Sequence, residues 1–214
     1  MVRLISAKRR HLILAGLALC ASLAIPVQNA VATAAGGADA PVRAFYSTLL
    51  DTMRNGLQLG VEGRYAKLAP TIRQSFDIPF MTRLSIGPDW NNLTQTQRAQ
   101  LTEAFERYVT AIYAERFSTY LGQQFIVTGE QASPGGTVIT SQIIKANGEP
   151  VHVNYLMRQN GSAWQIVDVY FNGTISELAT RRSEFSAILR TQGINGLIAA
   201  LNDKATSLGA PRSS

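Results

Sequence analysis

The fold of this chain is decided by TQTQRAQLTEAFERYVTAIYAERFSTYL, residues Thr94–Leu121. The stretch opens with a capping box, because the side chains of Thr94 and Gln97 can satisfy free N–H groups of a first helical turn. Nine apolar side chains then recur at helical spacing and cover roughly 220° of the helix circumference, more than the stripe of an ordinary surface helix. They are Leu101, Ala104, Phe105, Tyr108, Val109, Ile112, Tyr113, Phe117 and Tyr120.

The polar residues of this helix occupy the remaining arc. Glu106 and Arg116 are the two charges that interrupt the apolar side. A helix this apolar must be covered on two sides, or be covered on one side and line a cavity with the other. Periodicity alone leaves both a solid core and a cavity open. The residues assigned to the solvent side are Glu103, Arg107, Thr110 and Ser118.

The first 34 residues predict a cleaved signal peptide. A basic n-region is followed by the apolar segment Leu12–Ile25 and by a small-residue cleavage site near Ala32 or Ala34. The apolar run is shorter than a membrane span. The segment carries four of the 20 Lys and Arg residues and none of the 14 Asp and Glu residues, so the mature chain has 16 basic and 14 acidic residues. This near balance gives no indication of nucleic-acid binding.

The mature chain, residues 35–214, contains no cysteine, because Cys20 lies in the predicted signal. An exported protein without disulfides depends on its core for stability, which favours a bacterial periplasm over a small extracellular scaffold. The mature length fits one domain with a substantial core. The sequence therefore predicts a single periplasmic domain.

The order of elements predicts an α+β fold. Helical periodicity covers residues 41–53, 61–74, 78–84 and 94–121, and it returns after Thr174 with a break at Gly193. Between these helices, twofold alternation and turn sequences predict a four-stranded antiparallel meander packed against several helices and enclosing an apolar cavity. The expected strands are Phe125–Gly129, Thr137–Lys145, Val151–Gln159 and Ala163–Phe171.

Residues that could carry catalysis are sparse. The one mature histidine, His152, lies in mid-strand, and with no cysteine and no carboxylate cluster the sequence predicts neither a metal site nor a cofactor. A Gly-rich phosphate loop and a Gly-x-Ser-x-Gly motif are both absent. Asp168 is the one carboxylate within an apolar strand, so it is either a general base or a structural partner of an arginine. The candidate arginines are Arg116, Arg181 and Arg182.

Several of these features together resemble the MlaC-like family of periplasmic lipid carriers, also described under toluene tolerance. They are the exported cysteine-free domain, Trp90 before the Thr-capped aromatic helix, and WQIVDV at Trp164–Val169. The similarity extends from about residue 41 to about residue 204. The run DVYFNGTISELATRRSEF, Asp168–Phe185, is most similar to the hopanoid-associated HpnM branch. The phospholipid-shuttle branch more usually has Tyr before the Asp-Val pair and Glu-Gly-Val-Ser after the strand.

The resemblance implies a non-enzymatic carrier whose cargo is a membrane lipid, hopanoid or phospholipid. It further implies transfer between an inner-membrane lipid transporter and an outer-membrane complex. Because each buried CH₂ is worth about 0.8 kcal/mol, a carrier must enclose lipid tails, and we expect a cavity on the order of 1,000 Å³. The predicted ligand-binding residues are Phe105, Tyr108, Ile112, Arg116, Phe125, Val127, Ile139, Ile143, Val153, Tyr155, Met157, Trp164 and Ile166, and either Arg116 or Arg158 is expected to face the headgroup.

Two other functions stay open at this stage. One is an adaptor that binds the subunits of a membrane lipid-transport complex and carries no cargo. The other is an enzyme in which Asp168 is a general base in the cavity and Tyr155 or His152 is the acid. The enzyme requires the Asp168 carboxylate to be open to the cavity.

Overall fold

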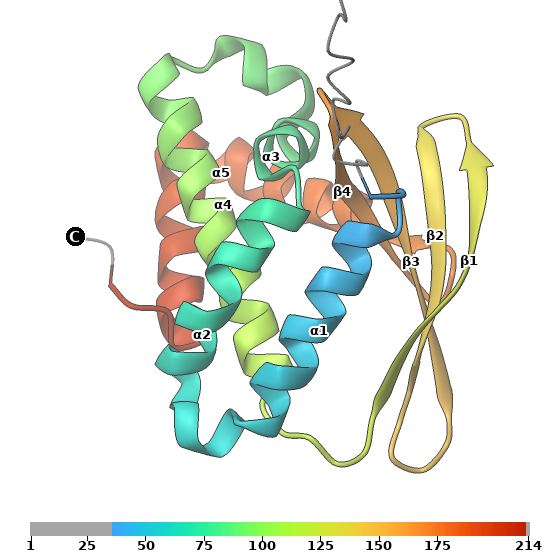
Figure 1. Cartoon of the computed structure of the whole chain (residues 1–214). Helices are drawn as coiled ribbons and strands as arrows, with labels where there is room; N and C mark the ends of the chain where they lie inside the picture. The colour runs from blue at the N-terminus through green and yellow to red at the C-terminus, as the bar shows by residue number, and fades with distance from the viewer. Residues whose placement is uncertain (1–35, 213–214) are drawn as a thin grey trace, which may run out of the picture. The chain divides into compact units, whose positions relative to one another are not determined.

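The computed structural model describes residues 36–212, so the predicted signal peptide and its cleavage site lie outside the described residues (Figure 1). Over this range the chain is α+β, as predicted, and no helix there is both long and apolar enough for a membrane span. The helices are α1 Ala40–Arg54, α2 Gly56–Ser75, α3 Ile78–Ile86, the 3₁₀ helix η1 Gly87–Asn92, α4 Gln95–Arg116 and α5 Glu177–Ser207. The strands are β1 Gln124–Ser133, β2 Gly136–Ile144, β3 Pro150–Asn160, β4 Ala163–Phe171 and β5 Ile175–Ser176.

The helix α4 begins as its sequence predicts. Thr94 Oγ1 accepts a hydrogen bond from the N–H of Gln97 at 3.2 Å, and the Gln97 side chain accepts one from the N–H of Thr94 at 3.0 Å. The helix ends at Arg116, earlier than the predicted Leu121, because Phe117 leaves the helical conformation. Tyr120 therefore lies beyond the helix and is exposed.

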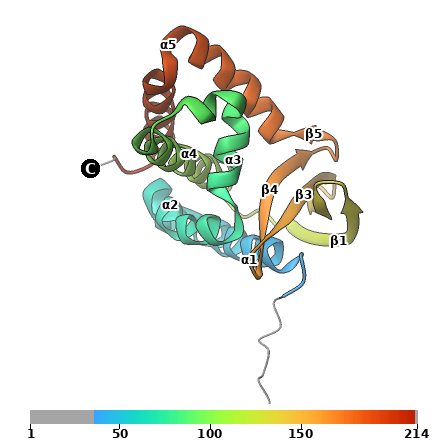
Figure 2. The ribbon, with the colours of Figure 1, turned by 90° about the horizontal axis from the view of Figure 1, so that it is seen from above.

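The side of α4 that the sequence assigned to solvent is partly buried, and for Arg107 and Thr110 that prediction is wrong. Both α2 and α5 lie beside α4 (Figure 2), so it is covered by helices on the side away from the sheet. Arg107 donates hydrogen bonds to Asn202 Oδ1 at 3.0 Å and to the Pro211 carbonyl at 2.6 Å. A buried guanidinium is tolerated here because these oxygens replace its water.

The sheet is an antiparallel meander in the order β1-β2-β3-β4-β5. The prediction of four strands is wrong by one, since β5 pairs its two residues with Tyr170 and Phe171 at the end of β4. A two-residue strand is too short to show alternation in a sequence. The turn before it uses positive φ angles at Asn172 and Gly173, a conformation that asparagine and glycine adopt readily.

A bulge in β4 determines which side chains near Asp168 lie on which face of the sheet. Tyr155 pairs with Val169 and Met157 pairs with Ile166, so Val167 is the extra residue of a bulge. Cross-strand partners share a face. Val169 therefore lies on the same face as Tyr155, and Asp168, which pairs with Leu156, lies on the other.

Asp168 joins β4 to the start of α5. Its Oδ1 accepts the N–H groups of Val169 at 2.8 Å and Leu178 at 3.1 Å, and its Oδ2 accepts the Ser176 hydroxyl at 2.6 Å. A carboxylate is favourable at this place because the first turn of a helix presents free N–H groups and a positive dipole end. From the sequence we expected an arginine as the structural partner of Asp168. Its partners are instead groups at the N-terminus of α5.

Removal of this carboxylate should loosen the β4–α5 junction. We expect Asp168→Ala to lower the free energy of unfolding by about 2–4 kcal/mol, because it leaves buried N–H groups without an acceptor. Asp168→Asn keeps one acceptor oxygen and should cost less. Urea denaturation measures both, with Glu130→Ala on the exposed surface of β1 as the control. Equal stability of Asp168→Ala and the control would contradict this role.

Candidate functional site

Two neighbouring aromatic residues of α1 lie between the sheet and α4. The Tyr46 ring is 5.0 Å from the Phe125 ring and 5.8 Å from the Tyr155 ring, measured between centroids. The Phe45 ring is 5.0 Å from the Tyr113 ring of α4, edge to face. The side chains of α1 thus contact the sheet on one side and α4 on the other. They hold α4 away from the sheet, so side chains must fill the space between these two elements.

The position of α1 on the sheet is fixed by a hydrogen-bond chain. The Tyr46 hydroxyl donates to Ser141 Oγ at 2.5 Å, and Ser141 in turn donates to the Val153 carbonyl. All three residues are buried. A buried polar chain of this kind stabilises one arrangement of helix and sheet, because sliding α1 along the strands would leave hydroxyl groups unpaired.

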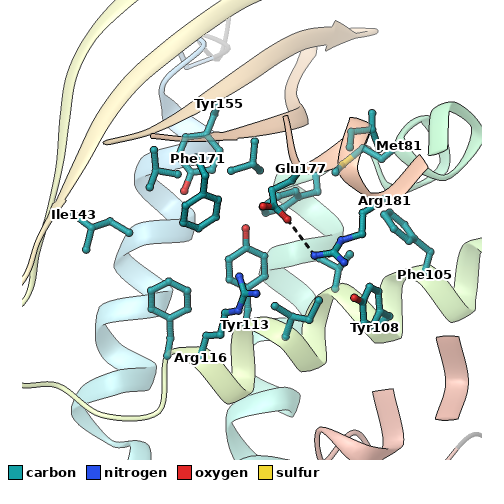
Figure 3. A pocket seen from close by; sticks show the side chains of 17 residues that line it. Met81, Phe105, Tyr108, Tyr113, Arg116, Ile143, Tyr155, Phe171, Glu177 and Arg181 are labelled. Carbon is teal, nitrogen blue, oxygen red and sulfur yellow. Dashed lines mark hydrogen bonds and ion pairs between the residues drawn. The ribbon is translucent and has the colours of Figure 1, made fainter. Parts of the chain in front are cut away.

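An apolar pocket of about 100 Å³ lies between α4, the sheet and the start of α5 (Figure 3). Helix α4 contributes Phe105, Tyr108, Val109, Ile112, Tyr113 and Arg116. The sheet contributes Ile143, Val153, Tyr155, Val169 and Phe171. The remaining lining residues are Phe76, Met81, Phe117, Glu177, Leu178 and Arg181.

The structure brings seven of the thirteen predicted ligand-binding residues together around this pocket. The seven are Phe105, Tyr108, Ile112, Arg116, Ile143, Val153 and Tyr155. The other six do not line it: Ile139, Met157 and Ile166 are buried in the core, and Phe125, Val127 and Trp164 pack half-buried against it. A ligand contact for any of the thirteen stays a prediction.

Several lining residues are absent from the predicted set. Tyr113 and Phe117 belong to the apolar arc of the decisive helix, so their helical spacing could have found them. Val169 and Phe171 share a sheet face with Tyr155 and Val153, which follows from the strand register. Glu177, Leu178 and Arg181 come from the far end of the chain, and local periodicity carries no signal for that approach.

The structure does not show, within residues 36–212, the large enclosed cavity expected from the sequence. The pocket of about 100 Å³ is an order of magnitude smaller than expected, and it lies below the roughly 300–1,000 Å³ of ordinary ligand sites. Aromatic rings occupy the space. The centroid of the Tyr113 ring lies 5.8 Å from that of Phe117 and 6.0 Å from that of Phe76. The interior between α4 and the sheet is therefore mostly filled in this conformation.

Three of the residues that line the pocket are charged, namely Arg116, Glu177 and Arg181. Arg181 bonds to Glu177 at 3.2 Å and to Glu184 at 2.6 Å, and its guanidinium lies 5.5 Å from the centre of the Tyr108 ring. Arg116 is the one lining residue that is exposed, and it forms no ion pair within residues 36–212. Because Arg116 is the exposed lining residue, we call the end of the pocket at Arg116 the mouth, and it carries a cation without an ion pair within residues 36–212.

The hydroxyl groups inside the pocket are neutral. Desolvation by burial raises the pKa of Tyr113 and Tyr155 above the ordinary tyrosine value of 10.0, and the neighbouring tyrosine hydroxyls add to this shift. Because a phenol with a raised pKa keeps its proton at neutral pH, these groups place no charge in the pocket. The charged side chains that line the pocket are Arg116 and the ion pair of Glu177 with Arg181.

The residues of the enzyme alternative do not meet. Tyr155 lines the pocket, whereas His152 is exposed on β3 and Asp168 does not line the pocket and is bonded to the start of α5. Residues 36–212 also contain no group of three His, Cys, Asp or Glu side chains placed to hold a metal ion. The arrangement offers a small apolar pocket next to an exposed cation.

These observations define the class: an α+β protein with an apolar pocket between a helical layer and an antiparallel meander. Residues 43–203 match the family described as MlaC protein, and the chain belongs to that family. The expected family is thus confirmed, while the HpnM branch stays a prediction.

The fold is similar to a solved structure of a phospholipid-binding protein from Ralstonia solanacearum in complex with a phospholipid. The TM-score is 0.69 at 22% sequence identity, over 81% of this chain and 99% of that one. At this identity the similarity establishes the fold, and the match spans nearly the whole of the solved chain.

Burial of Tyr113 should make stability depend on alkaline pH. Above pH 10.0 the unfolded chain loses the Tyr113 proton while the folded protein keeps it, so the free energy of unfolding falls as the pH rises. We expect Tyr113→Phe to make this decline shallower by about 1.4 kcal/mol per pH unit. Denaturation curves between pH 9 and about 12 measure the slope. Parallel curves for the two proteins would show that Tyr113 does not titrate as a buried group.

Proposed function

We propose that this protein is a lipid-binding carrier that works in the periplasm and shuttles a membrane lipid between inner and outer membranes. Membership of the MlaC family supports a binding and transport role over an enzymatic one. The solved neighbour, described as a phospholipid-binding protein in complex with a phospholipid, supports a lipid as cargo. Its partners in this proposal are an inner-membrane lipid transporter and an outer-membrane complex.

The observation that carries the proposal is the pocket between α4 and the sheet. Its walls are aliphatic and aromatic, its hydroxyls are neutral, and its mouth carries Arg116. Lipid tails gain about 0.8 kcal/mol for each CH₂ removed from water, so apolar walls alone provide the affinity. A cation at the mouth lies where the headgroup of an enclosed lipid would remain in water.

The pocket must widen to accept a lipid. A volume of about 100 Å³ holds only part of a tail, since whole ligands occupy roughly 300–1,000 Å³. Phe117 and Phe171 are half-buried at the pocket, and Phe117 has already left the end of α4. We assign the widening to these rings and to Tyr113, because the Tyr46–Ser141 hydrogen bond fixes α1 on the sheet.

A hopanoid is the favoured cargo, and a phospholipid is the alternative. The run Asp168–Phe185, which resembles the hopanoid-associated branch, supplies one wall of the pocket. Its lining residues are Val169, Phe171, Glu177, Leu178 and Arg181. A sequence difference between branches in this run therefore changes the surface that a cargo would touch.

Lipid extraction followed by mass spectrometry tests the proposal. Protein purified from a hopanoid-producing host should carry hopanoid, and Ile112→Trp should lose most of it because the indole fills the pocket. Ile126→Trp, at an exposed position of β1 outside the pocket, is the matched control and should keep the lipid.

The possible results separate the claims. Phospholipid alone on the wild-type protein would overturn the preference for hopanoid and keep the carrier. Neither lipid on the wild-type protein, or equal lipid on Ile112→Trp and Ile126→Trp, would contradict a cargo in this pocket. The first of these two results would favour the adaptor without cargo.

The cation at the mouth should affect charged headgroups more than tails. We expect Arg116→Gln to weaken binding of an anionic phospholipid by about threefold to fivefold, because an exposed ion pair is worth up to roughly 1 kcal/mol. Binding of an uncharged hopanoid should be unchanged. Arg190→Gln, at an exposed arginine of α5 outside the pocket lining, is the control. Equal losses for the charged and the uncharged lipid would contradict a headgroup role.

A further inference from the structure

Three exposed apolar side chains lie on two neighbouring segments at one end of the helical layer, and we call this set the tip. Leu57 is 91% exposed, Leu121 is 68% exposed and Tyr120 is 36% exposed. Leu57 follows the junction of α1 and α2, whereas Tyr120 and Leu121 belong to the segment between α4 and β1. Figure 1 shows both segments at the lower end of the molecule. Leu57 and Leu121 are the two most exposed large hydrophobic residues of the part that the structure describes.

Contacts between the two segments make the tip one surface. A Cβ atom at Gly56 would lie 1.9 Å from the Ser118 carbonyl oxygen, so the two backbones touch and only glycine fits. Arg64 donates to the Gly56 carbonyl at 2.9 Å and to the Ala114 carbonyl at 2.7 Å. The Arg54 guanidinium lies 5.2 Å from the centre of the Tyr120 ring. The α1–α2 junction is therefore tied to the end of α4.

The tip lies next to the mouth of the pocket. Arg116 and Phe117 line the pocket at the end of α4. Tyr120 follows Phe117 by three residues, which span at most about 11 Å even when fully extended. A surface that covers the tip would therefore also lie close to the mouth.

We infer that the tip docks the carrier on a lipid bilayer surface, with the mouth turned toward the lipids. The inference rests on the proposed function, since a carrier must receive its cargo without exposing the tails to water. Exposed leucines in the first turn of α2 and in the α4–β1 segment, beside a tyrosine in contact with an arginine, match the residues that anchor proteins at membrane interfaces. Because they project into solvent from two separate segments, they suit a deformable lipid surface better than a fixed protein socket.

The charges around the tip largely cancel. Arg54 and Arg116 are exposed and form no ion pair within the described residues, while Asp51 of α1 is neutralised by Lys67. Glu62 and Glu115 are also exposed on α2 and α4. The net attraction by charge is therefore small, and the leucines supply most of the docking energy.

Vesicle flotation tests this inference with the mature protein. Vesicles of phosphatidylethanolamine and phosphatidylglycerol should bind the wild-type protein, and Leu57→Ser with Leu121→Ser should lower the binding at least about tenfold, since burial of each leucine is worth a decade or more. The rate of lipid uptake from the vesicles should fall by a similar factor. Leu84→Ser, which removes an exposed apolar side chain of α3, should change neither quantity.

The cargo measurement separates this inference from the proposed function. The tip variant should reach the same lipid content as the wild type after long incubation, because its pocket is intact. Vesicle binding that is unaffected by the tip substitutions overturns the inference. This holds also if the substitutions impair the transfer of lipid to a membrane protein, because the tip would then be a protein contact. Vesicle binding that depends on the tip, in a protein that never holds lipid, would keep the docking surface and refute the carrier.

Discussion

The aromatic contacts of α1 are the interaction on which the rest of the structure depends. Tyr46 fixes α1 to the sheet through its ring and its hydroxyl, and Phe45 contacts α4 from the neighbouring position. The side chains of Phe45 and Tyr46 therefore lie between helix α4 and the sheet. The facing aromatic residues of α4 and the sheet cannot close on each other, and a pocket forms where they meet the start of α5.

The distribution of charge around this pocket indicates what it can bind. Arg181 is satisfied by Glu177 and Glu184, and the buried tyrosines keep their protons, so the interior offers apolar surface and neutral hydroxyls. Asp168 is used to hold the start of α5 and is not available as a base. Arg116 is the group left for an external partner. This arrangement suits an apolar ligand. Asp168, Tyr155 and His152 are not brought together for proton transfer.

Much of the fold could be predicted because its signals are local. The capping box of Thr94, the apolar arc of α4 and the turn sequences between strands each act over a few residues, and the helix start, the strands and the family follow from them. The fifth strand was not predicted, because a strand of two residues shows no periodicity. The burial of Arg107 could not be predicted from local sequence, because its partners Asn202 and Pro211 lie 95 and 104 residues further along the chain. The site was found in part for the same reason: α4 shows its lining in its periodicity, whereas α5 reaches the pocket through long-range contacts alone. The size of the cavity depends on how the rings interlock, which no one-dimensional pattern records.

A crystal structure of the protein loaded with lipid tests the central claim most directly. We predict hydrocarbon between α4 and the sheet, with Tyr113, Phe117 and Phe171 turned away from their present positions and the headgroup near Arg116. The Tyr46–Ser141 hydrogen bond should be unchanged, because α1 holds the sheet in both states. Lipid bound elsewhere on the protein, with these three rings still filling the pocket, would contradict the account.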